Sequence, residues 1–216
     1  SPVRTGVGKF LGSLQSVPAE DLAAAVIRET VARSGIDPGV IEDVSFAQSY
    51  SNSEAPCIGR WAGLAAGLPL EVPGFQQDRR CGGGLQAIAT AAMMVQTGAA
   101  DAVVAGGVES MSNIEYYTTS MRGGSRAGNV TLYDRLERGR ERSQPLARFG
   151  PISGMIETAE NLARDYQISR EDSDAWAAQS HQRAAAATAA GKFDAETMAV
   201  EVPQRRGEAL TFAADE

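Results

Sequence analysis

A cysteine followed by three glycines is the part of this sequence best suited to chemistry. Cys81 precedes Gly82–Gly84, where a strand is expected to pass into a helix, and Arg79 and Arg80 add positive charge just before it. The partial positive charge of a helix N-terminus stabilises a thiolate, while glycines let the backbone and its N–H groups approach a bound oxyanion. The pattern predicts a nucleophilic cysteine. The alternative is an inert cysteine buried beneath a glycine-rich turn, and the residues alone leave both interpretations open.

Few other side chains offer comparable chemistry. His181 is the one histidine, which excludes metal sites with two histidines, and its setting predicts a surface position on a helix. Cys57 is expected to open a helix, where it either packs, acts as a nucleophile or pairs with Cys81. Glu109 follows two glycines and is expected to accept structural hydrogen bonds, with a general-base role as the alternative. No metal site is predicted.

The composition of the chain excludes several classes of protein. The chain has 216 residues, 43% of them hydrophobic, a net charge of −7 and two cysteines. This profile predicts one large or two small globular domains, without a secreted disulfide framework. The acidic balance and the lack of a basic run argue against nucleic-acid binding, and no apolar stretch is long enough to span a membrane. A cytoplasmic location is expected.

Alternating helix and strand signals are expected to position Cys81. Their order predicts a parallel α/β sheet. The predicted elements are a helix over 18–34, a strand over 44–47, a helix over 57–66, a strand over 74–78, a helix from 81 to 98 with Leu85, Ile88, Ala92 and Val95 on one face, and a strand over 101–105 that is buried on both faces and stopped by Gly106 and Gly107.

The second half of the sequence has a different character. Residues 113–150 show no sustained period and predict a long functional excursion. A helix over 158–166 follows. Ser169 and Asp172 form a capping box that predicts a helix to about residue 190, and a strand is expected over 198–202.

Several segments resemble, in chain order, motifs of the N-terminal half of the thiolase family. They are Val3–Thr5, Asp78–Ala87, Gly106–Ser112, Thr158–Ala163, Ile168–Asp172 and Val202–Gly207. The resemblance implies the α/β thiolase fold, with a mostly parallel mixed sheet and helices on both faces. It also implies an N-terminal core over 1–112 with its first strand clipped, and an incomplete, mainly helical loop domain over 113–216 that covers the active site. The C-terminal thiolase domain would be absent.

The resemblance further implies an acetyl-CoA C-acyltransferase, which is a 3-ketoacyl-CoA or acetoacetyl-CoA thiolase of fatty acid metabolism. Cys81 matches the cysteine that forms the acyl-enzyme intermediate. Coenzyme A and acyl-CoA would be substrates rather than permanent cofactors, and a homodimer or homotetramer would be the assembly. The family's activating histidine and second catalytic cysteine lie in the C-terminal half, so this chain by itself is expected to be inactive. His181 would have no catalytic role.

Contacts to coenzyme A are expected from the loop domain. Met155 matches a methionine near the pantetheine arm, with plain helix packing as the alternative. Many short-chain members carry histidine just before that methionine, whereas this sequence has Gly154, which leaves the acyl chain length open. Five arginines either face coenzyme A phosphates or are solvated: Arg122, Arg126, Arg138, Arg140 and Arg142.

Two other functions compete with thiolysis. One is a ketoacyl-synthase-like condensing enzyme, which is disfavoured by the match over Thr158–Ala163. The other is a non-catalytic thiolase-like subunit that binds acyl-CoA or lipid, which is disfavoured by the presence of Cys81.

Overall fold

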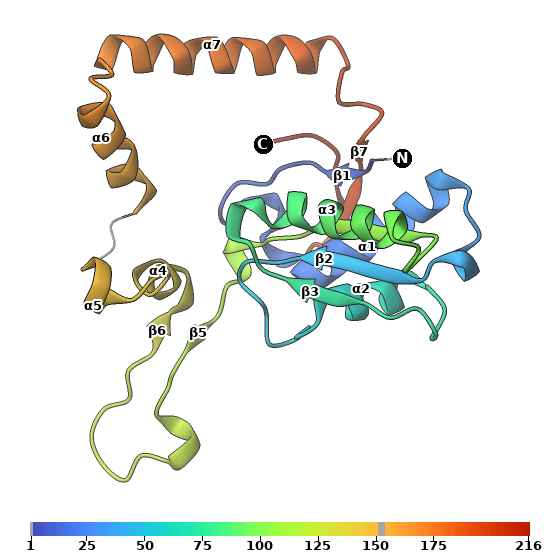
Figure 1. Cartoon of the computed structure of the whole chain (residues 1–216), viewed down its shortest axis with the longest axis horizontal. Coiled ribbons are helices and arrows are strands. Elements are labelled where there is room, and N and C mark those ends of the chain that lie inside the picture. The colour runs from blue at the N-terminus through green and yellow to red at the C-terminus, as the bar shows by residue number, and fades with distance from the viewer. Residues whose placement is uncertain (1, 151–153) are drawn as a thin grey trace. The chain divides into compact units, whose positions relative to one another are not determined.

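The computed structural model describes residues 2–150 and 154–216, which form two compact units (Figure 1). Unit 1 contains Ser1–Ile114 and Ala195–Glu216, and unit 2 contains Glu115–Asp194. The contacts thus group residues 195–216 with the first unit, whereas the sequence placed them in the loop domain. The functional division at residues 112 and 113 stays a prediction about the complete protein.

Unit 1 follows the predicted alternation of helices and strands. The first two helices end where glycine was expected to end them. Gly35 and Gly67 follow these helices and adopt φ of 69° and 94°. The elements of unit 1 are β1 (Arg4–Thr5), α1 (Ala19–Ser34), β2 (Asp43–Ala47), α2 (Ile58–Ala66), β3 (Phe75–Gln77), α3 (Gly83–Gln96), β4 (Val103–Gly107), β7 (Thr197–Met198), β8 (Val200–Val202) and β9 (Leu210–Phe212).

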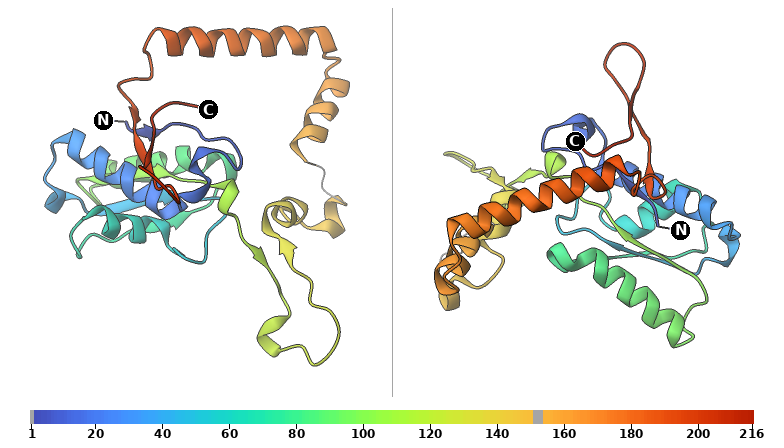
Figure 2. Two further views of the ribbon diagram at one scale, coloured as in Figure 1. Left: turned by 180° about the vertical axis from the view of Figure 1, so that it is seen from behind. Right: turned by 90° about the horizontal axis from the view of Figure 1, so that it is seen from above.

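The centre of unit 1 is a parallel sheet in the order β3-β2-β4. Side chains of β2 alternate between its two faces. Val44 and Phe46 pack with α1 and α2 in the main hydrophobic core, whereas Ser45 on the other face donates a 3.2 Å hydrogen bond to the carbonyl of Ala87 in α3. Figure 2 shows α3 on one side of the sheet and α1 on the other. Helices therefore cover both faces, as predicted.

The strand expected over 101–105 is β4, and its glycines lie inside it rather than beyond it. The strand is half-buried, so the prediction of burial on both faces was wrong. A Cβ on Gly106 would lie 2.7 Å from the Phe46 ring, and one on Gly107 would lie 3.1 Å from the carbonyl oxygen of Ala47. The glycines extend the strand because they let β4 lie directly against β2.

The large apolar residues of α3 share one face, but that face points away from the sheet. Leu85, Ile88 and Val95 are 75%, 57% and 47% exposed. The helix contacts the sheet instead through its small residues Gly83, Ala87 and Ala91, which are buried. Small residues bring α3 close to β2 and β4, so the larger ones are left outside.

The two ends of unit 1 are tied together by acidic residues of its last segment. Arg4 pairs with Glu196 and Asp215 at 2.7 Å each. The Arg4 guanidinium, with the N–H of Val7, lowers the pKa of Asp215. The hydroxyl of Ser13 and neighbouring backbone N–H groups lower the pKa of Glu216. These contacts hold the loop after β1 in place.

Unit 2 is built from short strands and mostly exposed helices. Ser169 accepts a 3.0 Å hydrogen bond from the N–H of Asp172 and donates its hydroxyl to Oδ2 of Asp172 at 2.8 Å, which confirms Ser169 as the N-cap of the predicted helix. The helix predicted over 158–166 begins three residues earlier, at Met155. The elements are β5 (Tyr116–Tyr117), antiparallel to β6 (Tyr133–Asp134), then α4 (Arg135–Glu141), α5 (Leu146–Phe149), α6 (Met155–Asp165) and α7 (Arg170–Ala189).

Across residues 2–150 and 154–216, no helix combines the length and the apolar character that crossing a bilayer requires. Within the same ranges, no three His, Cys, Asp or Glu side chains gather as they would around a metal ion.

Candidate active site

The carboxyl ends of β3, β2 and β4 meet at one edge of the parallel sheet. Ligands of open α/β sheets commonly bind at this edge. Residues 78–82 follow β3, residues 48–51 follow β2, and Val108 and Glu109 follow β4. The predicted nucleophile is therefore on the chain segment that leaves this edge and enters α3.

Cys81 is exposed and lies in a single 3-10 turn, Arg80–Gly82, immediately before α3. The predicted handover from strand to helix is confirmed, and the thiol is not buried beneath the turn. The two arginines before it have separate partners, because Arg79 donates to Oε1 of Gln86 and Arg80 donates to the carbonyl of Ser49. Neither side chain is free to swing over the thiol without losing that bond.

The three glycines after Cys81 have different surroundings. A Cβ on Gly83 would lie 3.0 Å from the Cβ of Ala47, so this glycine lets α3 start against β2. Apart from the adjoining chain itself, no atom of the described residues lies within 4 Å of such a Cβ on Gly82 or Gly84, so both positions face open space. The N–H groups of Gly82 and Gly83 donate to the carbonyls of Arg79 and Arg80, so these two N–H groups are engaged within the turn.

Five residues at the strand ends form a hydrogen-bonded set, here called the strand-end cluster: Ser49, Tyr50, Asp78, Arg80 and Glu109. The Glu109 carboxylate accepts from the N–H groups of Ser49 at 2.9 Å and Tyr50 at 3.3 Å. Its predicted role as a structural acceptor is confirmed. The sequence did not identify Ser49, Tyr50 or Asp78, although an Asp two residues before Arg80 is a signature of a side-chain-to-backbone turn.

Cys57 is the residue just before α2. It is half-buried, and its Sγ donates to the carbonyl of Gly74 at 3.4 Å. Both cysteines are free thiols, so the disulfide considered for Cys57 and Cys81 is not formed. The geometry of Cys57 is that of a packed helix-start cysteine.

The residues predicted to hold coenzyme A belong to unit 2, separately from Cys81 in unit 1. Met155 is the first residue of α6 and is 74% exposed. Arg138 stacks over the Tyr133 ring, with its guanidinium carbon 3.6 Å from the ring centroid. The other four predicted arginines are exposed, namely Arg122, Arg126, Arg140 and Arg142. His181 on α7 is exposed too.

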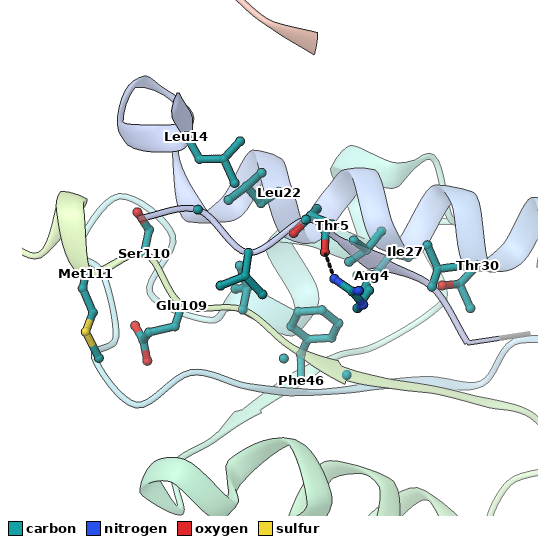
Figure 3. Close-up of a pocket in the computed structure, with 18 of the residues that line it drawn as sticks. Arg4, Thr5, Leu14, Leu22, Ile27, Thr30, Phe46, Glu109, Ser110 and Met111 are labelled. Carbon is teal, nitrogen blue, oxygen red and sulfur yellow. Dashed lines mark hydrogen bonds between the residues drawn. The ribbon is translucent and has the colours of Figure 1, made fainter. Parts of the chain in front are cut away.

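Unit 1 also contains a cavity of about 470 Å³ (Figure 3). It is bounded by the loop after β1, by α1 and by residues 104–112 of β4 and its continuation, with the Phe46 ring among its lining. Cys81 is not part of its lining. Glu109 of the strand-end cluster lines the cavity, whereas the predicted nucleophile lies outside it.

Comparison with known proteins agrees with the architecture. The family model described as "Thiolase, N-terminal domain" matches residues 1–216. The chain is 40% identical over 213 residues to an acetyl-CoA acetyltransferase of Pseudomonas aeruginosa, covering 99% of this chain and 53% of that protein. It is 38% identical over 213 residues to a probable acetyl-CoA acyltransferase of Staphylococcus epidermidis, with the same coverage of 99% and 53%.

Comparison with a solved structure identifies the fold as well. The crystal structure of the Bacillus anthracis acetyl-CoA acetyltransferase matches with a TM-score of 0.90 at 36% identity, covering 99% of this chain and 52% of that one. The thiolase fold predicted from the motifs is thus confirmed. The chain spans about half the length of the curated relatives it matches. The chain belongs to the thiolase family and corresponds to its N-terminal domain.

Proposed function

We propose that the complete protein containing this chain transfers acyl groups between coenzyme A and the thiol of Cys81, as a 3-ketoacyl-CoA or acetoacetyl-CoA thiolase. The observation that carries the proposal is the exposed Cys81 thiol at the start of α3, with open space beside Gly82 and Gly84. The relatives named acetyl-CoA acetyltransferase support the same class of reaction.

The proposed step has a simple balance of bonds. The Cys81 thiolate attacks the keto carbonyl carbon, C3, of a 3-ketoacyl-CoA, and the bond between C2 and C3 breaks. The electron pair leaves on the acetyl-CoA fragment, which takes up a proton, and the remaining acyl group stays on sulfur as a thioester. A second coenzyme A thiolate then attacks this thioester and restores Cys81. Because a thioester is exchanged for a thioester, the second step costs little free energy.

The loop-domain role is part of the same proposal. The exposed side chains of Met155, Arg122 and Arg126 leave unit 2 with apolar and cationic groups available to the pantetheine arm and phosphates of coenzyme A. A homo-oligomer, a cytoplasmic location and a role in fatty acid metabolism complete the proposal.

The test is the CoA-dependent cleavage of acetoacetyl-CoA by the complete protein. We expect Cys81→Ser to lower kcat by about 1,000-fold or more, because the alcohol is a far weaker nucleophile. The matched variant Cys57→Ser should stay within about twofold of the wild type.

Residual activity of Cys81→Ser above about one tenth of the wild type would overturn the covalent mechanism. Release of CO₂ from a malonyl thioester without cleavage of acetoacetyl-CoA would instead identify a condensing synthase. Binding of acyl-CoA without either reaction would identify a non-catalytic subunit.

A further inference from the structure

The residue immediately before Cys81 has an unusual backbone. Arg80 has φ of 50°, in the left-handed region that non-glycine residues seldom adopt. Such a conformation is strained and persists where the surroundings determine it strongly. Within residues 2–150 and 154–216, Leu11 and Gln167 are the other non-glycine residues with positive φ.

The backbone and side chain of Arg80 are held by separate contacts. Its N–H donates to Oδ1 of Asp78 at 2.8 Å, which closes a local turn after β3. Its guanidinium donates to the carbonyl of Ser49 at 3.1 Å and lies 5.9 Å from the centroid of the Tyr50 ring. The same guanidinium lies 3.5 Å from Oδ2 of Asp78. Arg80 is thus held both by Asp78 after β3 and by Ser49 and Tyr50 after β2.

The loop that receives the Arg80 side chain is itself anchored. Ser49 and Tyr50 donate their N–H groups to the Glu109 carboxylate, which follows β4. A chain of hydrogen bonds therefore runs from β4, through the loop after β2, to the residue that precedes Cys81. Each link joins the side chain of Glu109 or Arg80 to the backbone of Ser49 or Tyr50, so the side chains of Ser49 and Tyr50 are not needed for it.

The conformation of Arg80 also shapes the start of α3. Its carbonyl accepts the N–H of Gly83, and Arg79 accepts the N–H of Gly82 at 3.1 Å. If Arg80 returned to the right-handed or extended region, these bonds would break and Cys81 would move away from the helix start. A displaced thiol would lose its fixed position at the helix start, and a nucleophile out of place reacts more slowly.

We propose that Arg80 is a positioning residue, whose left-handed backbone, held by Asp78 and by the carbonyl of Ser49, fixes the Cys81 thiol at the start of α3. This inference rests on the proposed function, in which Cys81 is the nucleophile. Arg80 does not touch the substrate in this account and acts only through Cys81.

Three substitutions in the complete protein separate the contributions of Arg80. Arg80→Ala removes the side-chain contacts with the carbonyl of Ser49 and with Oδ2 of Asp78 but still disfavours positive φ, so it should displace Cys81 most. Arg80→Gly removes the same side-chain contacts and accepts positive φ without cost. Arg80→Lys keeps a cationic donor for the carbonyl of Ser49 and should rescue most of the effect. Gln167→Gly is the matched control, because it relieves a positive φ of 55° in unit 2.

The first readout is the iodoacetamide alkylation rate of Cys81 divided by that of Cys57 in the same molecule near neutral pH. We expect this ratio to fall about tenfold in Arg80→Ala, about threefold in Arg80→Gly and less than about twofold in Arg80→Lys and Gln167→Gly. The kcat for acetoacetyl-CoA cleavage should fall in the same order, with KM changed by less than about threefold.

An unchanged alkylation ratio in Arg80→Ala would overturn the proposal. Equal changes at Cys57 and Cys81 would overturn it too, because they would indicate general loosening. If Arg80→Ala fails to fold, the ratio in Arg80→Gly decides alone. A wild-type protein that lacks thiolysis would refute the proposed function, whereas the alkylation ratios would still decide the role of Arg80.

Discussion

Two helices of unit 1 begin beside a cysteine, and the two cysteines differ in their exposure. At the start of α2, Cys57 is half-buried and its sulfur donates to the carbonyl of Gly74. At the start of α3, Cys81 is exposed and has glycines with empty surroundings on either side of Gly83. A cysteine at a helix N-terminus is thus not sufficient for a nucleophile, because access to the sulfur decides whether the position can be used.

The glycines of the two helix starts show the same contrast. A Cβ on Gly59 of α2 would lie 2.8 Å from the carbonyl oxygen of Val44 and even closer to the backbone of Phe75. On α3, Gly83 meets the Ala47 side chain, and Gly84 meets nothing within 4 Å. The start of α2 packs tightly against the backbone of neighbouring strands. The start of α3 packs against β2 at Gly83 and faces open space at Gly84.

The largest effect that would sharpen this contrast is on stability. We expect Gly59→Ala to destabilise the complete protein by about 3 kcal/mol or more, because the new methyl group meets rigid backbone. Gly83→Ala should cost about 1 kcal/mol, since the Ala47 side chain can shift by a few tenths of an ångström. The two thermal midpoints measure the difference. Equal losses would show that the two helix starts are packed alike.

A smaller effect is expected at the open position. Gly84→Ala should leave the thermal midpoint unchanged or slightly higher, because alanine favours a helix. Its kcat/KM for acetoacetyl-CoA should nevertheless fall about tenfold, since the methyl group enters the open space at the start of α3 that we expect the substrate to occupy. Wild-type kcat/KM in Gly84→Ala would mean that this space is not used by the substrate, and the contrast between the helix starts would then be one of packing only.

Local signals predicted much of unit 1 correctly. Helix limits followed from Pro18, Gly35 and Gly67, and Ser169 caps its helix as expected by accepting from the N–H of Asp172. These features depend on a few neighbouring residues, which is why the sequence is enough to locate them. The position of Cys81 between β3 and α3 was predicted for the same reason.

Other features depend on contacts between distant segments and were not predictable in this way. Gly106 and Gly107 lie inside β4 because Phe46 and Ala47 of β2 approach them closely. The bond between Arg4 and Asp215 joins residues 211 positions apart. The apolar pattern of α3 was correct, but a pattern alone does not tell which of two faces meets the sheet.

The strand-end cluster was only partly predictable. Glu109 was expected to accept structural hydrogen bonds, but its donors on Ser49 and Tyr50 lie about 60 residues earlier in the chain. The positive φ of Arg80 gave no signal, because arginine is not a residue type associated with that conformation. The sequence thus predicted the residues Cys81 and Glu109, whereas the contacts among the residues of the strand-end cluster could be identified only from the structure.

The most direct test of the central claim is to locate the acyl group. The complete protein is incubated with acetyl-CoA, quenched in acid, digested and analysed by mass spectrometry, with and without a later addition of coenzyme A. We expect an acetyl group on the peptide that contains Cys81, none on the peptide that contains Cys57, and loss of the label when coenzyme A is added. An unlabelled Cys81 during turnover, or equal labelling of both cysteines, would contradict the central claim.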